Sequence, residues 1–496
     1  MSNPFPVTAP LIPIIEAGDR IIWRGRHSLT RIDKEICDYW AVPFDVPGGL
    51  RRLTVRYTFS GEVDASVVDG SGNVIDIGIW DARGHALGAP GFRGWSGSFR
   101  RSFSLGPRDE TTPGYVPGPI YPGRWHLILG LYQIRPDGCV VEVEVLGEPG
   151  DADVDASFVP SVRDNLNSGV DGSGPLWCRG DLHAHTCHSD APGTVRELIQ
   201  AARARGLDFI AVTDHNTVSA WAEFNAEDAG DLLWIPGEEI TTYRGHANVW
   251  AGGTWYDFRV RTAEELAHIL DAAQASGALV SVNHPRIGGP AWEWGTDLPF
   301  DCVEVWNGWW PWWNDQALAF WEALLCQGRR VVAVGGSDRH QGSVSGVQAF
   351  LMVGQPTTWI FASERSVAGL LAGLRSGRVC VSAEPTGPHV DLSVITSDGR
   401  MAWMGEVLRV PEGQTLTAWA HVKGAAGYRL RWVARGETVG RSVIEADDVM
   451  LPLKLEASAG YVRIQVEDPA TDPSEATDPF VDVVALGNPV WITISP

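Results

Sequence analysis

Residues able to bind metal ions gather in the middle of this chain. Eight of its 13 histidines fall between residues 183 and 340, and most of them follow a short apolar run. Neutral imidazole nitrogens together with carboxylate oxygens are the ligands of hydrolytic metal centres. They occur in five segments, which are His183-Ala-His185-Thr186, Thr213-Asp214-His215, His246-Ala-Asn248, Asn283-His284-Pro285 and Ser337-Asp338-Arg339-His340. The sequence therefore predicts a metal-dependent hydrolytic site.

The spacing of these residues indicates how they reach a common site. Residues two apart in an extended strand project to the same face, so His183 and His185 can bind one ion together, as can Asp338 and His340. One such pair is common by chance. Five strand ends that all carry a metal-binding residue are not expected of histidines that only fill a core. We therefore expect these side chains to converge at one edge of a sheet.

Strands that alternate with helices are predicted for residues 176–383. Thr194 and Thr262 each stand three residues before a glutamate, which is the capping box that begins a helix, and Gly206 and Gly277 end these two helices. Repeated βα units predict a parallel sheet, and about 200 residues suit a (β/α) barrel whose chemistry lies where its strands end. The predicted strands include residues 209–212, 279–282, 302–305 and 331–334.

The two flanking regions are predicted to be all-β. Residues 1–175 contain alternating apolar runs separated by Gly and Pro, which is typical of a jelly-roll-like domain. The end of that region, residues 160–175, has the composition of a linker. From residue 384 to 496 the pattern returns to strands and predicts a β-sandwich. The expected architecture is thus an α/β barrel between two β domains.

Composition excludes several classes of function. The net charge of -22 disfavours nucleic-acid binding, whereas a small anionic substrate is compatible because bound cations reverse the local field. No run of about 18 apolar residues predicts a membrane span, and no export signal is visible. The seven cysteines show no close pairing, so we expect a reducing cytoplasm. Nothing in the sequence indicates the oligomeric state.

The ordered set of motifs resembles the polymerase and histidinol phosphatase (PHP) family of metal-dependent hydrolases. That resemblance implies a distorted seven-stranded (β/α)7 barrel that binds two or three divalent ions, commonly Zn, Mn or Fe. The matching segments are Asp181-Leu-His183-Ala-His185-Thr186, Ser189-Asp190, Thr213-Asp214-His215, Pro236-Gly-Glu-Glu239, Gly245-His246, Asn283-His284-Pro285 and Gly336-Ser337-Asp338-Arg-His340.

The resemblance also implies which residues bind each ion. The first ion is expected between His183, His185, Glu239 and Asp338. Glu239 would bridge to a second ion, which His246 and His284 also bind. A third ion would be bound by Asp190, His215 and His340.

The mechanism expected of this site is attack by a metal-bound water on phosphorus or on a carbonyl carbon. Arg286 and Arg339 stand beside the ligand motifs and are candidates for contacting an anionic group. Arg339 would point away from its flanking ligands if that segment is extended, so a salt bridge is an equal interpretation. Indoles follow the strand at 302–305 and predict a substrate pocket for an aromatic group, unless they pack as a rigid loop. The candidate pocket residues are Trp306, Asn307, Trp309 and Trp310.

Three functions follow from this interpretation. The arrangement of domains, with Asn488-Pro489 near the end, is similar to the carbaryl-hydrolase-like branch of the family. That branch implies hydrolysis of a carbamate, ester or amide, whereas phosphoester hydrolysis is the commoner activity of the family and ranks slightly ahead. A non-catalytic, metal-bound scaffold is the third hypothesis, although none of the nine ligand positions is lost. The expected partner is a small anionic or aromatic molecule.

Overall fold

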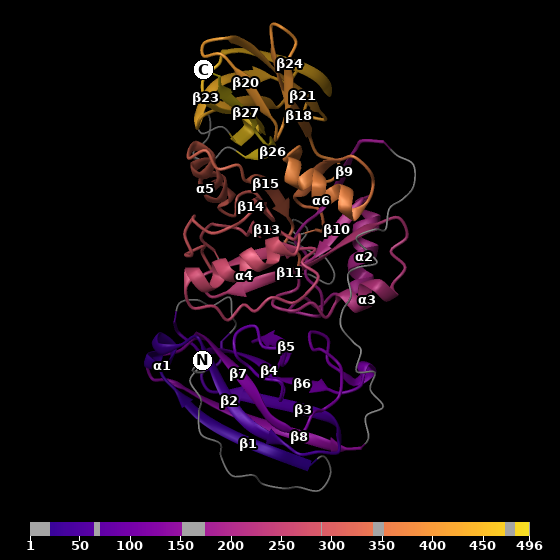
Figure 1. The fold of residues 1–496 in the computed structure, drawn as a ribbon, viewed down its shortest axis with the longest axis vertical. Helices are drawn as coiled ribbons and strands as arrows, with labels where there is room; N and C mark the ends of the chain where they lie inside the picture. The colour runs from indigo at the N-terminus through magenta and orange to yellow at the C-terminus, as the bar shows by residue number, and fades with distance from the viewer. Residues whose placement is uncertain are drawn as a thin grey trace.

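The chain forms three parts that follow one another along the longest axis of the computed structural model (Figure 1). The N-terminal part lies at the bottom of that view, the helix-containing part in the middle and the C-terminal part at the top. The structure describes residues 20–63, 70–150, 174–288, 290–340, 352–471 and 482–495. Most of the linker predicted at 160–175 lies outside these residues, and the predicted domain boundaries at 175 and 383 stay predictions.

Two four-stranded antiparallel sheets form the N-terminal part. Buried residues alternate along strands of the first sheet such as Arg20–Leu29, whereas Val74–Trp80 of the second sheet is buried throughout. The two sheets enclose one apolar core. A short helix, α1 (Arg31–Ile36), begins at a capping box of Thr30 and Asp33. The first sheet contains β1 (Arg20–Leu29), β8 (Cys139–Pro149), β3 (Leu50–Phe59) and β6 (Ser102–Leu105). The second contains β2 (Tyr39–Val46), β7 (Gly123–Gln133), β4 (Val74–Trp80) and β5 (Phe92–Gly97).

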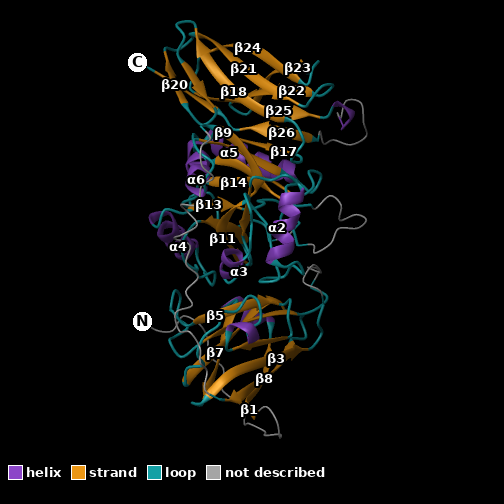
Figure 2. Ribbon diagram, turned by 90° about the vertical axis from the view of Figure 1, so that its right-hand side faces the viewer, coloured by secondary structure: helices purple, strands orange, loops and turns teal. Residues whose placement is uncertain are grey.

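The middle part is built on seven strands that lie side by side in chain order. Helices α4 and α6 lie on one side of these strands and α2 on the other (Figure 2). The strands are β9 (Leu176–Asp181), β10 (Phe209–Val212), β11 (Leu233–Thr242), β12 (Gly245–Trp250), β13 (Leu279–Val282), β14 (Cys302–Asn307) and β15 (Val332–Gly336). The helices are α2 (Val195–Ala204), α3 (Trp221–Ala226), α4 (Ala263–Ala275), α5 (Asn314–Cys326) and α6 (Val367–Ser376).

The helix starts predicted from the sequence are confirmed. Thr194 caps α2 with a full capping box, and the Thr262 side chain accepts the backbone N–H of Glu265 at the start of α4. Gly206 and Gly277 follow the ends of these helices with φ of 67° and 96°. Glycine adopts this left-handed conformation without steric cost, which explains why the helices stop there.

The prediction of a fully parallel sheet is wrong at β12. This strand pairs antiparallel with both β11 and β13, whereas the other neighbours from β9 to β15 pair parallel. Only Tyr243 and Arg244 separate β11 from β12, which leaves no room for a crossover helix. The alternation of strands and helices in the rest of the region concealed this hairpin.

The two ends of the strand series meet at the predicted metal motifs. Beyond β9 and β15 the chain pairs again in parallel, at Ala184 and Arg339. The backbone N–H of Asp338 donates to His183 O at 2.9 Å, and that of His185 donates to Arg339 O at 3.1 Å. Strand β16 (Thr357–Ala362) pairs with β9, and the Thr358 hydroxyl hydrogen-bonds with both backbone groups of Gly335 on β15. The segments that carry the predicted ligands thus help to join the first strand, β9, to the last strand, β15.

The C-terminal part continues the central sheet. Strand β17 (Val379–Ser382) pairs with β26, and a second sheet packs on the continuation across an apolar core. The continuation contains β26 (Val483–Gly487), β25 (Gly460–Glu467), β22 (Arg429–Ala434), β23 (Glu437–Val443), β27 (Val490–Ile494) and β20 (Val407–Val410). The second sheet contains β19 (Met401–Trp403), β18 (His389–Thr396), β21 (Thr415–Lys423) and β24 (Asp448–Glu456).

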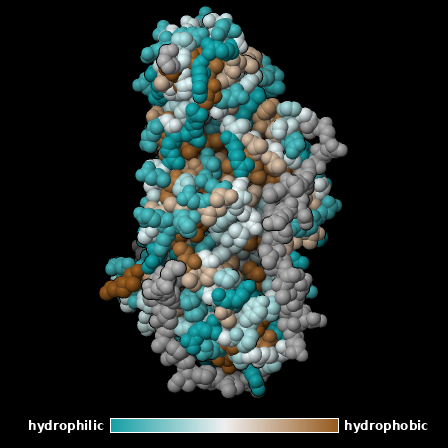
Figure 3. Space-filling model, in the orientation of Figure 1, coloured by the Kyte–Doolittle hydropathy of each residue, from teal (hydrophilic) through white to brown (hydrophobic). Residues whose placement is uncertain are grey.

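All three parts contribute to one apolar cluster. Trp80 from the N-terminal part, Phe258 and Val305 from the middle and Trp491 from the C-terminal part belong to the same set of buried, contacting side chains. The three parts therefore pack against each other through their interiors rather than through polar surfaces alone. The face shown in Figure 3 is mostly hydrophilic, with separate apolar patches such as the one over α1. None of the described helices is long and apolar enough to cross a bilayer.

Asn488 ties the C-terminal part to the central strands. Its buried side chain accepts the backbone N–H of Ala333 at 2.7 Å and donates to the carbonyls of Ala333 and Val379, both at 2.9 Å. Its side chain therefore hydrogen-bonds with three backbone groups, near the start of β15 and at the start of β17.

We predict that Asn488→Ala lowers the free energy of unfolding by about 3 kcal/mol, because it removes three buried hydrogen bonds, although the carbonyl of Val379 still accepts the backbone N–H of residue 488 at 3.1 Å. Urea denaturation measures the change. Lys454→Ala, at an exposed position of β24, is the control and should change stability by less than about 0.5 kcal/mol. Equal stability of the two variants would contradict the role of Asn488.

Candidate metal centre

The structure brings all nine predicted ligands into one cluster. Their nitrogen and oxygen atoms form four overlapping groups, each with its atoms within 4.8 Å of one another. His183, His185, His215 and Glu239 each belong to two groups, so the groups are continuous. The four are His185–Asp190–His215–His340, His183–Glu239–His284, His183–His185–Asp338 and His215–Glu239–His246. His246 and His284, which the sequence assigned to one ion, lie in different groups.

Glu239 lies at the centre of this cluster. Its side chain is fully buried, and its oxygens lie 2.7–3.6 Å from ring nitrogens of five histidines. His246 Nδ1 and His284 Nε2 both approach Oε1, at 3.1 and 3.4 Å. Burial acts to raise the pKa of Glu239, but the charges of nearby histidines such as His183 hold it well below its ordinary value. Glu239 is therefore an ionised carboxylate placed to bridge.

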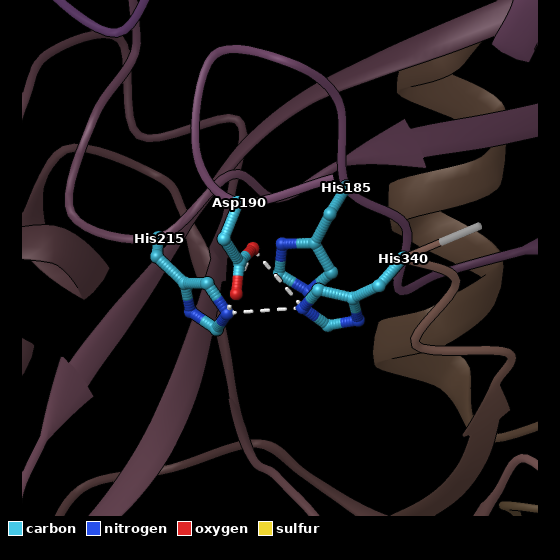
Figure 4. Close-up of side chains that lie close together, drawn as sticks. All are labelled: His185, Asp190, His215 and His340. Carbon is cyan, nitrogen blue, oxygen red and sulfur yellow. Dashed lines mark hydrogen bonds and ion pairs between the residues drawn. The ribbon is translucent and has the colours of Figure 1, made fainter. Parts of the chain in front are cut away.

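The group of His185, Asp190, His215 and His340, drawn in Figure 4, is less buried than the other three groups. His215 Nε2 and His340 Nε2 face each other at 3.3 Å, and Asp190 Oδ1 lies 3.2 Å from His340 and 3.6 Å from His215. The side chains of Asp190 and His215 are 38% and 19% exposed, compared with 1% for His183. This group is thus the side of the cluster that a molecule from solvent meets first.

The donor atoms fit divalent cations. Within the described part of the chain, His183 Nε2 and His246 Nε2 are buried and form no hydrogen bond, although carboxylate oxygens of Glu239 and Asp338 each lie 3.3 Å from His183 Nε2. Such buried nitrogens are costly unless another group satisfies them. The nitrogens of His215 and His340 would repel each other at 3.3 Å if both presented lone pairs, unless a proton or cation lay between them. Six imidazoles with three carboxylates are a ligand set typical of Zn, Mn or Fe.

Two ligands adopt strained backbone conformations. His284 has φ of 30° and Asp338 has φ of 50°, a region that non-glycine residues rarely occupy. Such strain persists only where the surroundings impose it, and it is concentrated at functional sites.

Glu304 supports the cluster and was missed by sequence reasoning. Its Oε1 lies 3.0 Å from His183 Nδ1, and its Oε2 accepts the backbone N–H of His284 and the side-chain amide of Asn307, both at 3.1 Å. It therefore fixes the ring of one ligand and the backbone of another. The available signal was a charged residue inside the apolar strand Cys302–Val305.

Asp181 and Asp214 organise the motif segments. Asp181 accepts the backbone N–H groups of His183, Ser337 and Gly354 at 2.7–3.1 Å. Asp214 accepts the hydroxyl of Ser189 at 2.6 Å, beside the ligand Asp190. Both carboxylates accept hydrogen bonds from backbone or hydroxyl groups of the motif segments, so they position the ligands.

The two predicted arginines differ in burial and in surroundings. Arg286 is partly buried and donates to Asn307 Oδ1 at 2.7 Å, with Asp338 among the charges that act on it, and burial lowers its pKa. Arg339 is buried and interacts electrostatically with Asp181 and Glu197, neither of which is a predicted ligand. Arg286 thus has a ligand carboxylate, Asp338, among its electrostatic neighbours.

A cavity of about 760 Å³ opens onto the cluster. The ligands Asp190, His215 and His246 line one side of it, and the N-terminal part lines much of the rest. Its aromatic lining consists of Trp95, Phe99, Tyr132 and Tyr243.

The pocket predicted from Trp306, Asn307, Trp309 and Trp310 is a different place, and none of these residues lines the cavity. Trp306 and Trp310 are buried and pack on each other at 4.9 Å between ring centroids. Asn307 is buried too, and its amide lies 3.3 Å from Asp338 Oδ2. Trp309 is exposed and packs against Trp312. The indole-rich segment is thus better described as a packed loop, which was the alternative to a substrate pocket.

Comparison with known families identifies the segment that holds the first motifs. Residues 181–251, which run from Asp181 through His246, match the model of the PHP domain. The chain carries a PHP domain. The family resemblance stated for these motifs is confirmed, whereas the carbaryl-hydrolase-like branch stays a prediction. No curated protein matches the chain.

Several solved structures resemble the PHP-containing chain weakly. A two-domain protein with a predicted PHP-like metal-dependent phosphoesterase from Bacteroides vulgatus has 18% identity and a TM-score of 0.34, and the match covers 61% of this chain and 93% of that one. A protein named as a metal-dependent phosphoesterase from Bifidobacterium adolescentis has 17% identity and a TM-score of 0.26, covering 35% and 91%. An amidohydrolase from Chromobacterium violaceum has 18% identity and a TM-score of 0.25, covering 34% and 90%. These TM-scores are too low to assign a reaction.

We predict that Glu304→Gln weakens binding of Zn²⁺ or Mn²⁺ by about 10-fold to 100-fold, because His183 loses its carboxylate partner. Competition with a chromogenic chelator measures the affinity. Glu238→Gln is a matched control. Glu238 is also buried, its Oε2 accepts the backbone N–H of Tyr256 at 2.8 Å, and burial raises its pKa well above the ordinary value. Equal losses in the two variants would assign the effect to general disturbance of the core.

Proposed function

We propose that the protein is a metal-dependent hydrolase, with a phosphoester as the substrate that fits best. The observation that carries this proposal is the convergence of nine ligand side chains on one cluster that faces a large cavity. We interpret the ring of strands from β9 to β15 as the distorted (β/α)7 barrel expected of the family. We expect the protein to lie in the cytoplasm and its substrate to be a small molecule.

The chain offers positions for two or three ions. His183, His185, Glu239 and Asp338 would hold one, and Glu239 would share a second with His246 and His284. The outer group of Asp190, His215 and His340 would hold the third. When bound, ions of the Zn, Mn or Fe type supply Lewis acidity and lower the pKa of water.

The chain's own residues orient the cluster and exclude water from its inner side. The Asn283 amide donates to Glu239 Oε1 at 2.9 Å and fixes that carboxylate. His183, His185 and Glu239 are buried, so substrate is expected on the side of Asp190 and His215, where the cavity lies. Arg286 stays the candidate for contacting an anionic oxygen, because it lies beside Asp338. We assign Arg339 to supporting the backbone near Asp181 rather than to catalysis.

Hydrolysis of a carbamate, ester or amide is the second candidate. The aromatic lining of the cavity favours it, since an uncharged aryl carbamate gains from apolar contact and needs no cationic side chain. A metal-bound scaffold without activity is the third candidate.

The decisive experiment is to load the purified protein with Mn²⁺, Zn²⁺ or Fe²⁺ and assay paired panels of aryl phosphates and aryl carbamates. Turnover confined to phosphates supports the proposal, and turnover confined to carbamates favours the second candidate. Absence of turnover in every metal form would favour the third candidate, a metal-bound scaffold without activity.

We predict that replacing His183 and His185 by alanine lowers kcat by at least about 1000-fold and reduces bound metal, because the ion expected between His183, His185, Glu239 and Asp338 would lose two of its four ligands. Chelation of the wild-type protein should remove activity and re-addition of metal should restore it. His268→Ala, at an exposed position of α4, is the control and should keep both activity and metal. Retained turnover in the double variant would place the chemistry elsewhere.

A further inference from the structure

The N-terminal part forms the wall of the cavity that faces the ligands. Strands β4 and β5 contribute Asp76 and Trp95, and the segment after β5 contributes Phe99 and Arg101. Across the cavity lie Asp190, His215 and His246. A molecule bound at the exposed side of the cluster would therefore extend towards side chains that do not belong to the PHP domain.

This wall is held firmly against the ligands. The guanidinium of Arg100 donates to the backbone oxygen of Ser189 at 2.9 Å and to that of Cys187, so it fixes the loop that carries Asp190. The hydroxyl of Tyr243 donates to the buried carboxylate of Asp76 at 2.6 Å. The distance between wall and ligands is thus set by direct bonds between the two parts.

Tyr243 reaches Asp76 only because residue 130 is a glycine. A Cβ at Gly130 would lie 2.2 Å from the Tyr243 hydroxyl. The ring of Tyr243 is also flanked by Tyr39 and Tyr132, at 5.4 and 5.2 Å between ring centroids. The contacts of Tyr243 with Asp76 and with the neighbouring tyrosines fix the rings of Tyr132 and Tyr243 that line the cavity.

Phe99 presents an uncovered ring in this cavity. Its side chain is 49% exposed, although a large aromatic ring is normally buried. The guanidinium of Arg100 lies 5.2 Å from its ring, which positions Phe99 through the residue that holds the Asp190 loop. The ring therefore has a fixed place and an open face.

The charged groups near Phe99 all have hydrogen-bond partners. Arg100 donates to two backbone oxygens of the loop that carries Asp190. Arg101 forms an ion pair with Glu62 and donates to the Tyr57 hydroxyl at 3.0 Å. The Asp76 carboxylate accepts the hydroxyl of Tyr243. This end of the cavity thus offers aromatic surface beside charged groups that are already hydrogen-bonded, whereas the ligand end offers sites for an anion beside cations.

We propose that Phe99, together with Trp95 and Tyr132, which line the same cavity, forms a subsite for an uncharged aryl group of the substrate. The substrate would be an aryl ester whose hydrolysed group lies at Asp190, His215 and His246 and whose ring packs on Phe99. This inference rests on the proposed function for the position of the reacting group, but the subsite itself can be tested by binding alone.

The test compares phenylphosphonate with methylphosphonate, which share the anionic group and cannot be hydrolysed as esters. Calorimetric titration of the metal-loaded, full-length protein should show a preference of about 10-fold or more for the phenyl compound. Phe99→Ala should reduce that preference to about 3-fold or less, and Phe99→Leu should retain an intermediate preference. Metal content should be unchanged in both variants.

Trp309→Ala is the matched control, because Trp309 is an aromatic side chain of similar exposure, 43%, in the indole-rich segment outside the cavity. It should keep the full preference for phenyl. A preference lost in Trp309→Ala and kept in Phe99→Ala would overturn the proposal, as would equal binding of the two phosphonates by the wild-type protein.

Hydrolysis assays on the same proteins separate this inference from the proposed function. Turnover of phosphate esters with no phenyl preference would reject the subsite and keep the hydrolase. A phenyl preference that depends on Phe99, in a protein that hydrolyses nothing, would keep the subsite and reject the hydrolase.

Discussion

A buried carboxylate surrounded by imidazoles is the constraint on which the rest of the structure depends. Glu239 is removed from water, and no lysine or arginine of the described residues forms an ion pair with it. An ionised carboxylate in such a place is costly unless positive charge lies close on several sides. Ring nitrogens of five histidines from four segments face its oxygens, where protonated rings or bound cations would supply that charge, so the strands that carry them must end at one point. Closure at Ala184 and Arg339 brings the first and last of these segments together.

Holding so many ligands together requires a surrounding set of bonds. Glu304, Asn283 and Asp181 each contact a ligand side chain or its backbone. The left-handed conformations of His284 and Asp338 are maintained within this network. The cost of that strain is distributed over packed strands and the apolar cluster behind them, which is why the site lies on rigid elements.

The sequence predicted which side chains converge, because ligand chemistry restricts residue type and the ordered motifs resemble a known family. The family resemblance was needed to select Asp190 and Glu239, and two of the helices around the cluster begin at explicit caps. Glu304 was missed because a single glutamate in a strand has no local signature, and its partner His183 lies 121 residues away. The β11–β12 hairpin was missed because its two-residue turn contains neither Gly nor Pro. The cavity wall at Phe99 depends on how two parts of the chain pack, which local patterns do not encode.

The division of the cavity between two stretches of chain separates chemistry from recognition. The ligands belong to the central strands, where a change of residue type disturbs many bonds at once. Phe99 lies on a short connection between β5 and β6, and the exposed face of its ring does not contribute to packing. Selection can therefore retune which molecules are accepted by exchanging one or two side chains on that connection, while Arg100 preserves the geometry of the reacting centre.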